Sequence, residues 1–230
     1  MSKLAVVIPV YNEEGSIEVV IADWAKVLDQ LQIDYRLCAY NDGSKDNTHK
    51  ILDGLLEKFP KLHAIHKVNS GHGPTILKGY KENLDCEWLF QVDSDNEMKA
   101  EHFPKLWEQR NNYDFLIGKR INRQSPLPRR IISYISYLSV RLLYGAGIQD
   151  VNAPYRLMRV SLFKDLIAKI PDDTFAPNVI VSGLACMKKA RIFTHPVPFE
   201  FRTTGTVSIK KWKLLKAAMK SFWQTIKFRF

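Results

Sequence analysis

Short β-rich runs alternate with amphipathic helical stretches along the first half of the chain, and this alternation limits the fold more than any other feature. Strands joined through helices run parallel, because each crossover returns the chain in the same direction. The sequence therefore predicts an α/β fold with a mostly parallel sheet flanked by helices. Strands are expected at 4–10, 35–40, 62–67, 88–92, 114–118 and 193–201, and helices at 16–31, 48–59, 74–84, 102–111, 162–170 and 178–189.

Polar motifs follow the first four expected strands at the point where each ends. Ligands of open α/β sheets bind at the carboxyl ends of the strands, so these motifs are expected to converge on one rim. The motifs are Tyr11-Asn12-Glu13-Glu14, Asn41-Asp42-Gly43-Ser44, Asn69-Ser70-Gly71 and Asp93-Ser94-Asp95. Beyond residue 118 we expect a Pro- and Arg-rich loop at 122–130 and a tyrosine-rich helical stretch to residue 144, with no assignment for 150–159.

Charge is distributed unevenly along the chain. Residues 1–118 carry 13 Lys and Arg against 19 Asp and Glu, a charge of −6, whereas residues 119–230 carry 21 against 5, a charge of +16. A basic half is typical of proteins that meet nucleic acid, an anionic membrane or phosphorylated ligands. The three cysteines lack metal-ligand spacing, and no window holds the roughly 20 apolar residues that a membrane span needs. We therefore expect a cytoplasmic protein without a transmembrane helix.

Asp93 and Asp95 place two carboxylates on the same side of an extended segment, where hard oxygen ligands can hold Mg²⁺ or Mn²⁺. A divalent ion there would neutralise a diphosphate as it becomes a leaving group. With 14 aspartates in the chain, this spacing arises about once by chance, so its place at a strand end carries the argument.

Two other motifs allow both a structural and a functional interpretation. Residues 41–48 can form a turn and a helix cap, while Asp42 can also accept hydrogen bonds from a nucleobase edge and Tyr11 can stack on the base. Residues 69–74 open a helix and can hold an anion at its start, although a simple tight turn fits equally well.

The order of motifs along the chain resembles that of family 2 glycosyltransferases with the GT-A fold, a Rossmann-like architecture. More narrowly, it resembles the branch of dolichol-phosphate mannose synthases and polyprenyl-phosphate glycosyltransferases. The motifs that carry the resemblance span nearly the whole chain and are VVIPVYNEEGSI, NDGSKDNT, NSGHGP, QVDSDNE, GKR, DVNAPYRLMR and FEFRTTG.

The resemblance implies roles for residues in these motifs. Its candidate nucleotide-sugar site comprises Pro9, Tyr11, Asn12, Glu13, Asp42, Ser44, Asn69, Gly71 and Asp93. The metal site comprises Asp93, Asp95 and Glu97, and the catalytic set is Asp93, Asp95 and Arg120. For the acceptor phosphate, the resemblance implies Arg120, one of the pair Arg129 and Arg130, and Arg202; the run of basic residues adds Arg123 and the other arginine of the pair to the candidates.

A phosphate acceptor needs no general base, because its second pKa is near ~6 and it is an anionic nucleophile at neutral pH. The arginines between residues 120 and 130 would hold it beside the donor, although a solvated basic loop is the alternative. We expect metal-dependent transfer of a hexose from a GDP- or UDP-sugar to polyprenyl or dolichyl phosphate, and the resemblance implies that the transfer is inverting. One alternative is transfer to a glycan hydroxyl in capsule or O-antigen assembly, with Asp150 as base. A second is a non-catalytic nucleic-acid- or membrane-binding module.

The C-terminal tail predicts a basic amphipathic helix. Its apolar side chains fall on one stripe, with lysines along the flank and no acid. We expect a glycosyltransferase domain at 1–206 and a membrane-interface helix at 207–230, peripheral on the inner face of the membrane, with a second interface helix near 131–144. The alternative is a stripe that packs on the core or on a partner. A small membrane protein remains a candidate partner, and no nucleic acid is expected. The stripe is Trp212, Leu215, Met219, Phe222, Trp223, Ile226 and Phe230.

Overall fold

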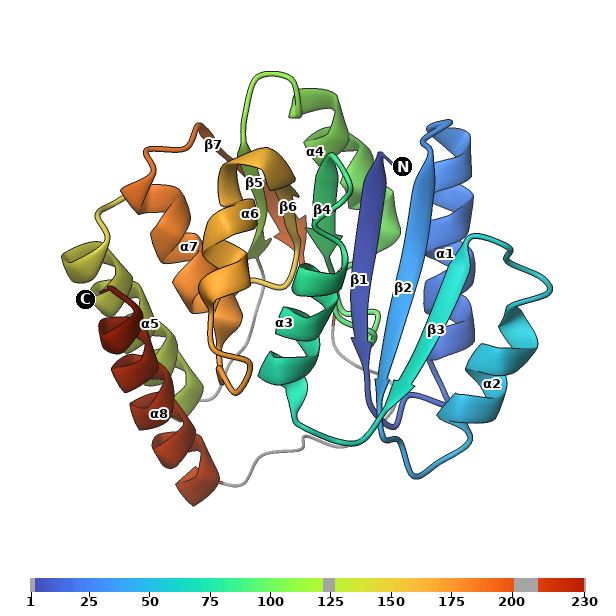
Figure 1. Cartoon of the computed structure of the whole chain (residues 1–230), viewed down its shortest axis with the longest axis horizontal. Helices are drawn as coiled ribbons and strands as arrows, with labels where there is room; N and C mark the ends of the chain where they lie inside the picture. Colours follow the sequence, from blue (N-terminus) through green and yellow to red (C-terminus); the bar gives the residue numbers. More distant parts are fainter. Residues whose placement is uncertain (1–2, 122–126, 201–210, 230) are drawn as a thin grey trace.

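The computed structural model describes residues 3–121, 127–200 and 211–229 (Figure 1). Only the backbone is described at 127–129 and 211–218. Its strands are β1 (Leu4–Val10), β2 (Tyr35–Asp42), β3 (Leu62–Lys67), β4 (Trp88–Gln91), β5 (Phe115–Ile121), β6 (Arg156–Arg159) and β7 (Ile192–Pro198). Its helices are α1 (Ile17–Gln30), α2 (Thr48–Leu55), α3 (His72–Glu82), η1 (Ala100–His102), α4 (Phe103–Gln109), α5 (Leu127–Leu143), α6 (Val160–Lys169), α7 (Pro177–Met187) and α8 (Lys211–Arg229).

The described strands form one seven-stranded sheet in the order β3-β2-β1-β4-β6-β5-β7. β6 is antiparallel to both of its neighbours, β4 and β5, while the other paired strands are parallel. The predicted α/β class with a mostly parallel sheet is confirmed. The six predicted strands are present; β1 and β3 have the predicted boundaries, and those of the other four differ by a few residues. β6 was missed, because it is four residues long and its first residue is a buried arginine, which does not give an apolar strand pattern.

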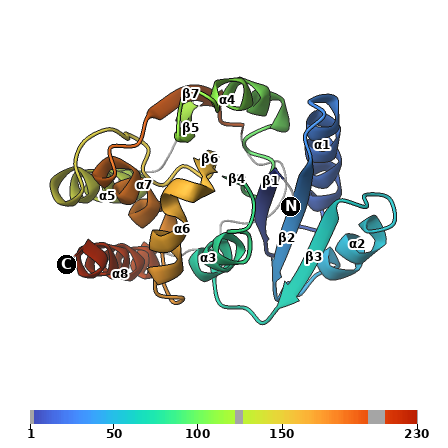
Figure 2. The same cartoon turned by 45° about the horizontal axis from the view of Figure 1, so that its top comes forward.

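Helices cover both faces of the sheet (Figures 1 and 2), and each face has its own apolar core. Successive side chains of a strand point to opposite faces. In β1, Leu4, Val6 and Ile8 enter the core beneath α1, α2 and α4, whereas Ala5 and Val7 enter the core beneath α3, α6 and α7. Because both faces are covered, every residue of β1 is buried, as a strand inside a parallel sheet requires.

α5 and α8 lie side by side at the end of the molecule remote from β3 (Figures 1 and 2). The Tyr144 hydroxyl, just after α5, donates to the carbonyl of Thr225 at 2.7 Å, and Arg229 donates to the carbonyl of Leu143 at 2.9 Å. The expected loop at 122–130 was wrong in its second half, because α5 begins at Leu127 and takes in Arg129 and Arg130. Within the described ranges, no helix combines the length and the hydropathy needed to cross a bilayer.

Candidate active site

The loop after β1 is joined to the loop after β2 by hydrogen bonds from backbone amides to side-chain oxygens. The Asn12 amide donates to Ser44 Oγ at 2.9 Å, and the Lys45 amide donates to Asn12 Oδ1 at 2.8 Å. Asn12 adopts a φ of 53°, a left-handed conformation that asparagine tolerates better than most residues. Tyr11 lies on the same loop and is 38% exposed, so its ring is accessible to a ligand.

Ser16, at the start of α1, connects the first of these loops to the loop that carries the aspartates. Its hydroxyl lies 2.8 Å from Glu13 Oε2 and 3.1 Å from the carbonyl oxygen of Ser94. Glu13 is buried, and its amide donates to Thr48 Oγ1 at 2.8 Å. The loops after β1, β2 and β4 therefore form one connected rim, as their positions at strand ends predict.

Asp42 connects the same rim to the loop after β3. Asp42 is 3% exposed, and its carboxylate pairs with Lys67 and accepts hydrogen bonds from the amides of Ser70 at 2.8 Å and Gly71 at 2.9 Å. Gly71 has a φ of +96°, which favours glycine, and the Asn69 side chain donates to the Asp42 carbonyl at 2.7 Å. Asp42 thus organises the loop at 69–71, and its role in reading a nucleobase remains a prediction. Pro9 is buried within β1, behind the rim.

Asp93, Asp95, Glu97 and Arg120 line one pocket beyond the carboxyl end of β4. Its other walls are mostly apolar and come from Val92, Met98, Pro154 and Phe199. Carboxylate oxygens are the donors that Mg²⁺ and Mn²⁺ prefer, so the three acids have the right chemistry for such an ion, although their oxygen atoms do not all lie within 4.8 Å of one another. The structure therefore brings together the three acids predicted to bind metal and one of the five arginines predicted to bind phosphate.

Desolvation raises the pKa of Asp93 above its ordinary value, and the neighbouring Asp95 carboxylate adds to this effect, against the charges of His72 and Arg120. His72 Nε2, in the first turn of α3, lies 3.5 Å from Asp93 Oδ1. A cation bound in the pocket would oppose this effect, because its charge favours the ionised form of Asp93.

A chain of side-chain hydrogen bonds that begins in the protein interior positions Asp93. Gln91 Nε2 donates to Asp93 Oδ1 at 3.0 Å, and Gln91 Oε1 accepts from Asn178 Nδ2 at 2.9 Å. Asn178 Oδ1 in turn accepts from the Tyr80 hydroxyl at 2.7 Å. These residues were not predicted from the sequence, although a glutamine that ends the apolar run of β4 and an asparagine within the apolar α7 are detectable signals.

Asp150 binds the guanidinium of Arg120 from the side. Arg120 Nε and Nη2 donate to the two Asp150 oxygens at 2.8 and 2.7 Å, and the Arg120 side chain is only 9% exposed. Two of its five N–H donors are used in this way. Arg120 is therefore held in one orientation at the wall of the pocket.

Within the described part of the chain, the structure does not place the other predicted phosphate-binding arginines at the pocket. Arg130 is exposed on α5 and is not among the residues that line the pocket. Arg129 lies in the first turn of α5, where only the backbone is described, and Arg123 and Arg202 lie outside the described residues. Their roles remain predictions.

Residues 5–167 match the model of glycosyl transferase family 2. This match covers more than half of the chain, which therefore belongs to that family and is a glycosyltransferase. The resemblance inferred from the order of motifs is confirmed at this level.

Relatives in the same family extend the comparison. An uncharacterized protein of Methanocaldococcus jannaschii is 29% identical over 97% of this chain and 98% of its own length. The undecaprenyl-phosphate 4-deoxy-4-formamido-L-arabinose transferase of Pseudomonas fluorescens is 29% identical over 79% of this chain. The chain covers only 54% of that transferase, about half of its length.

Solved structures share the fold. The glucosyl-3-phosphoglycerate synthase of Mycobacterium tuberculosis, in complex with Mn²⁺, UDP-glucose and glycerol 3-phosphate, superposes with a TM-score of 0.69 at 14% identity. The match covers 99% of this chain and 80% of that chain. Residues 1–349 of S. aureus TarS, in complex with UDP, give a TM-score of 0.62 at 20% identity over 94% and 64% of the two chains. At these identities the likeness supports the GT-A fold.

Proposed function

We propose that this glycosyltransferase moves a hexose, with inversion, from a GDP- or UDP-sugar to a polyprenyl phosphate at the cytoplasmic face of a membrane. The observation that carries the proposal is the pocket that Asp93, Asp95 and Glu97 line together with Arg120. The three acids would hold Mg²⁺ or Mn²⁺, which would supply positive charge to the donor diphosphate. The rim formed by the loops after β1, β2 and β3 would bind the nucleotide, with Tyr11 against the base and Ser44, Asn69 and Gly71 nearby.

The Arg120–Asp150 pair favours a phosphate acceptor over a hydroxyl. A hydroxyl needs a base with an accessible oxygen, and both Asp150 oxygens face the guanidinium. A phosphate needs oriented positive charge, which Arg120 provides from a fixed position. The relatives named as undecaprenyl-phosphate transferases support the same choice of acceptor.

The outer face of α5 and α8 supports the proposal that the protein acts at a membrane surface. α8 turns Ser221 and Thr225 inward, where both are buried, and turns Met219 and Trp223 outward, where they are 56% and 64% exposed. On α5, Leu142 is 75% exposed. Large apolar side chains outside and small polar ones inside reverse the usual order of a surface helix. With exposed Lys220 and Lys227 on the same helix, this pattern suits an anionic membrane surface.

The transfer reaction tests the proposal directly. Protein, Mn²⁺ and a panel of radiolabelled UDP- and GDP-sugars would be incubated with and without a short-chain polyprenyl phosphate. We expect label in the organic phase only when the phosphorylated lipid is present, and none with the unphosphorylated polyprenol. Label that appears only with a sugar-hydroxyl acceptor would establish the glycan alternative instead.

A further inference from the structure

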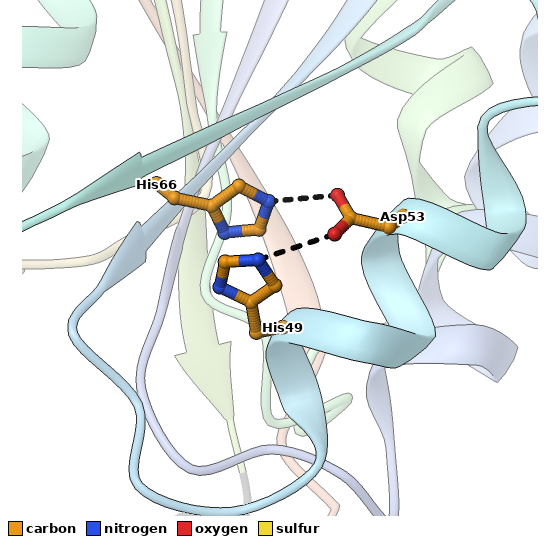
Figure 3. A group of neighbouring side chains, drawn as sticks. All are labelled: His49, Asp53 and His66. Carbon is orange, nitrogen blue, oxygen red and sulfur yellow. Dashed lines mark hydrogen bonds and ion pairs between the residues drawn. The ribbon is translucent and has the colours of Figure 1, made fainter.

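His49, Asp53 and His66 form a compact cluster on the side of the sheet covered by α2 (Figure 3). His49 and Asp53 lie one turn apart on α2, and His66 comes from β3. The two imidazole rings stack with centroids 3.7 Å apart, and each presents Nε2 to one oxygen of Asp53, at 3.2 Å from His49 and 2.9 Å from His66. Among the described residues, this is the one group of three such side chains whose ligand atoms all lie within 4.8 Å of one another.

We propose that this cluster binds a divalent transition-metal ion of the Zn²⁺ type. Two imidazoles and one carboxylate form a donor set that Zn²⁺ accepts and that Mg²⁺ disfavours, since Mg²⁺ prefers oxygen ligands. His49 and Asp53 are about half exposed, so water can complete the coordination. The site is separate from the Asp93 pocket, whose acids offer oxygen donors.

Without a metal ion, the cluster is connected through Asn41 to the rim formed by the loops after β1 and β2. The Asn41 side-chain oxygen accepts from the Ser44 amide at 3.1 Å, so its Nδ2 faces His66 Nδ1 at 3.0 Å and donates to it. This places the His66 proton on Nε2, where it is donated to Asp53. A metal ion on Nε2 requires the other tautomer, with the proton on Nδ1.

Metal binding to His66 Nε2 is therefore incompatible with the present orientation of the Asn41 side-chain amide. With a proton on His66 Nδ1, two donors would face each other, and Asn41 would have to turn its oxygen away from the Ser44 amide. Ser44 Oγ also accepts a hydrogen bond from the Asn12 amide, so a rearrangement of Asn41 and Ser44 would affect the loop after β1. We expect Zn²⁺ and nucleotide sugar to weaken each other's binding by the same factor, on the order of five-fold. This coupling rests on the nucleotide-sugar site of the proposed function.

Calorimetric titration with Zn²⁺, and titration with Co²⁺ followed by its visible absorption, test the site without any assay of activity. We expect one ion to bind per chain with an intense tetrahedral Co²⁺ spectrum. His66→Ala and Asp53→Asn should each weaken binding at least ten-fold, whereas His63→Ala, at an exposed histidine of the same strand, should leave it unchanged. Equal binding by wild type and His66→Ala would overturn the proposal.

Asn41→Asp gives a gain-of-function test that a misfolded variant cannot mimic. A carboxylate at this position could accept hydrogen bonds from both the Ser44 amide and the Nδ1–H of His66. Zn²⁺ affinity should therefore rise about ten-fold. Unchanged or weaker affinity would contradict the role given to Asn41. UDP titration with and without Zn²⁺ then tests the coupling, and no effect of Zn²⁺ on UDP affinity would refute the coupling while the metal site itself stands on the Co²⁺ spectrum.

Discussion

Asp150 accepts two hydrogen bonds from Arg120 in a side-on ion pair, with donor–acceptor distances of 2.8 and 2.7 Å, at the wall of the pocket that contains Asp93 and Asp95. Two parallel hydrogen bonds fix the plane of a guanidinium as well as its position. Asp150 is therefore better suited to orienting Arg120 than to removing a proton from an acceptor.

Asp150→Asn should lower kcat/KM for lipid phosphate about ten-fold, because one charge-assisted hydrogen bond is weakened while the shape is kept. Arg120→Lys should lower it about 100-fold, since an ammonium cannot reproduce the planar fork. Steady-state kinetics with varied acceptor check both values, and thermal unfolding controls for stability. Complete loss of activity in Asp150→Asn, with an unchanged melting temperature, would instead indicate a general base.

Gln91→Leu should weaken the apparent affinity for Mn²⁺ about 10- to 100-fold, because Asp93 loses the amide that orients it. The buried amide nitrogen of Asn178 would also lose its acceptor, at a cost of about 1–3 kcal/mol in the free energy of unfolding. Tyr80→Phe is the matched control, since it removes the far end of the same chain and leaves Gln91 in place. The Mn²⁺ dependence of transfer distinguishes the two variants, and equal Mn²⁺ dependence would argue against positioning by Gln91.

Trp223→Ser combined with Met219→Ser should abolish most co-sedimentation with vesicles that contain anionic lipid. Both side chains point away from the protein, so the substitutions remove apolar area from the membrane contact without opening a core. Val19→Ser, at an exposed apolar residue of α1, is the matched control and should sediment like the wild type. If the double variant still sediments fully at high salt, α8 is not the membrane contact.

Gly73→Ala should destabilise the protein by about 1–3 kcal/mol. A Cβ at Gly73 would lie 2.0 Å from the backbone oxygen of Phe175, so α3 would have to move away from the loop before α7. Gly54→Ala is the matched change in α2, where nothing lies within 4 Å, and it should stabilise by up to about 1 kcal/mol. Urea unfolding compares the two, and equal midpoints would show that the close approach of Gly73 is not maintained in solution.

Asp114 should contribute stability that disappears in acid. A hydrogen bond from Arg191, with its charge and that of Arg159, lowers the pKa of Asp114 to about 2. A lowered carboxyl pKa stabilises the fold above the unfolded-state value of about 4, and this stabilisation is lost as the pH falls from about 4 toward 2. Asp114→Asn should therefore be less stable than the wild type by about 1–2 kcal/mol at pH 7, with a smaller difference at pH 3. A difference that does not change with pH would exclude this ion pair as its source.

Local patterns in the sequence determined the elements of this protein and the order of its rim motifs. Buried apolar runs such as that of β1 and amphipathic stretches such as α1 are properties of neighbouring residues, so their period reveals them. Strand ends of a parallel sheet meet at one edge by geometry, which is why Asp93, Asp95 and Asn12 could be placed on the same rim. The short β6 and the beginning of α5 were not predictable in this way, because their formation depends on the neighbours that they pair with or pack against.

Only the tertiary structure decided which side chains engage one another across the chain. Gln91, Asn178 and Tyr80 come from three separate elements, and His66 meets His49 and Asp53 only because β3 lies beside α2. Hydrogen bonds and ion pairs act over about 3 Å, so they depend on distances that sequence periodicity does not specify. The outward direction of Trp223 has the same origin. A helical stripe shows that one face differs from the other, while the packing of Thr225 on Tyr144 determines which face meets the solvent.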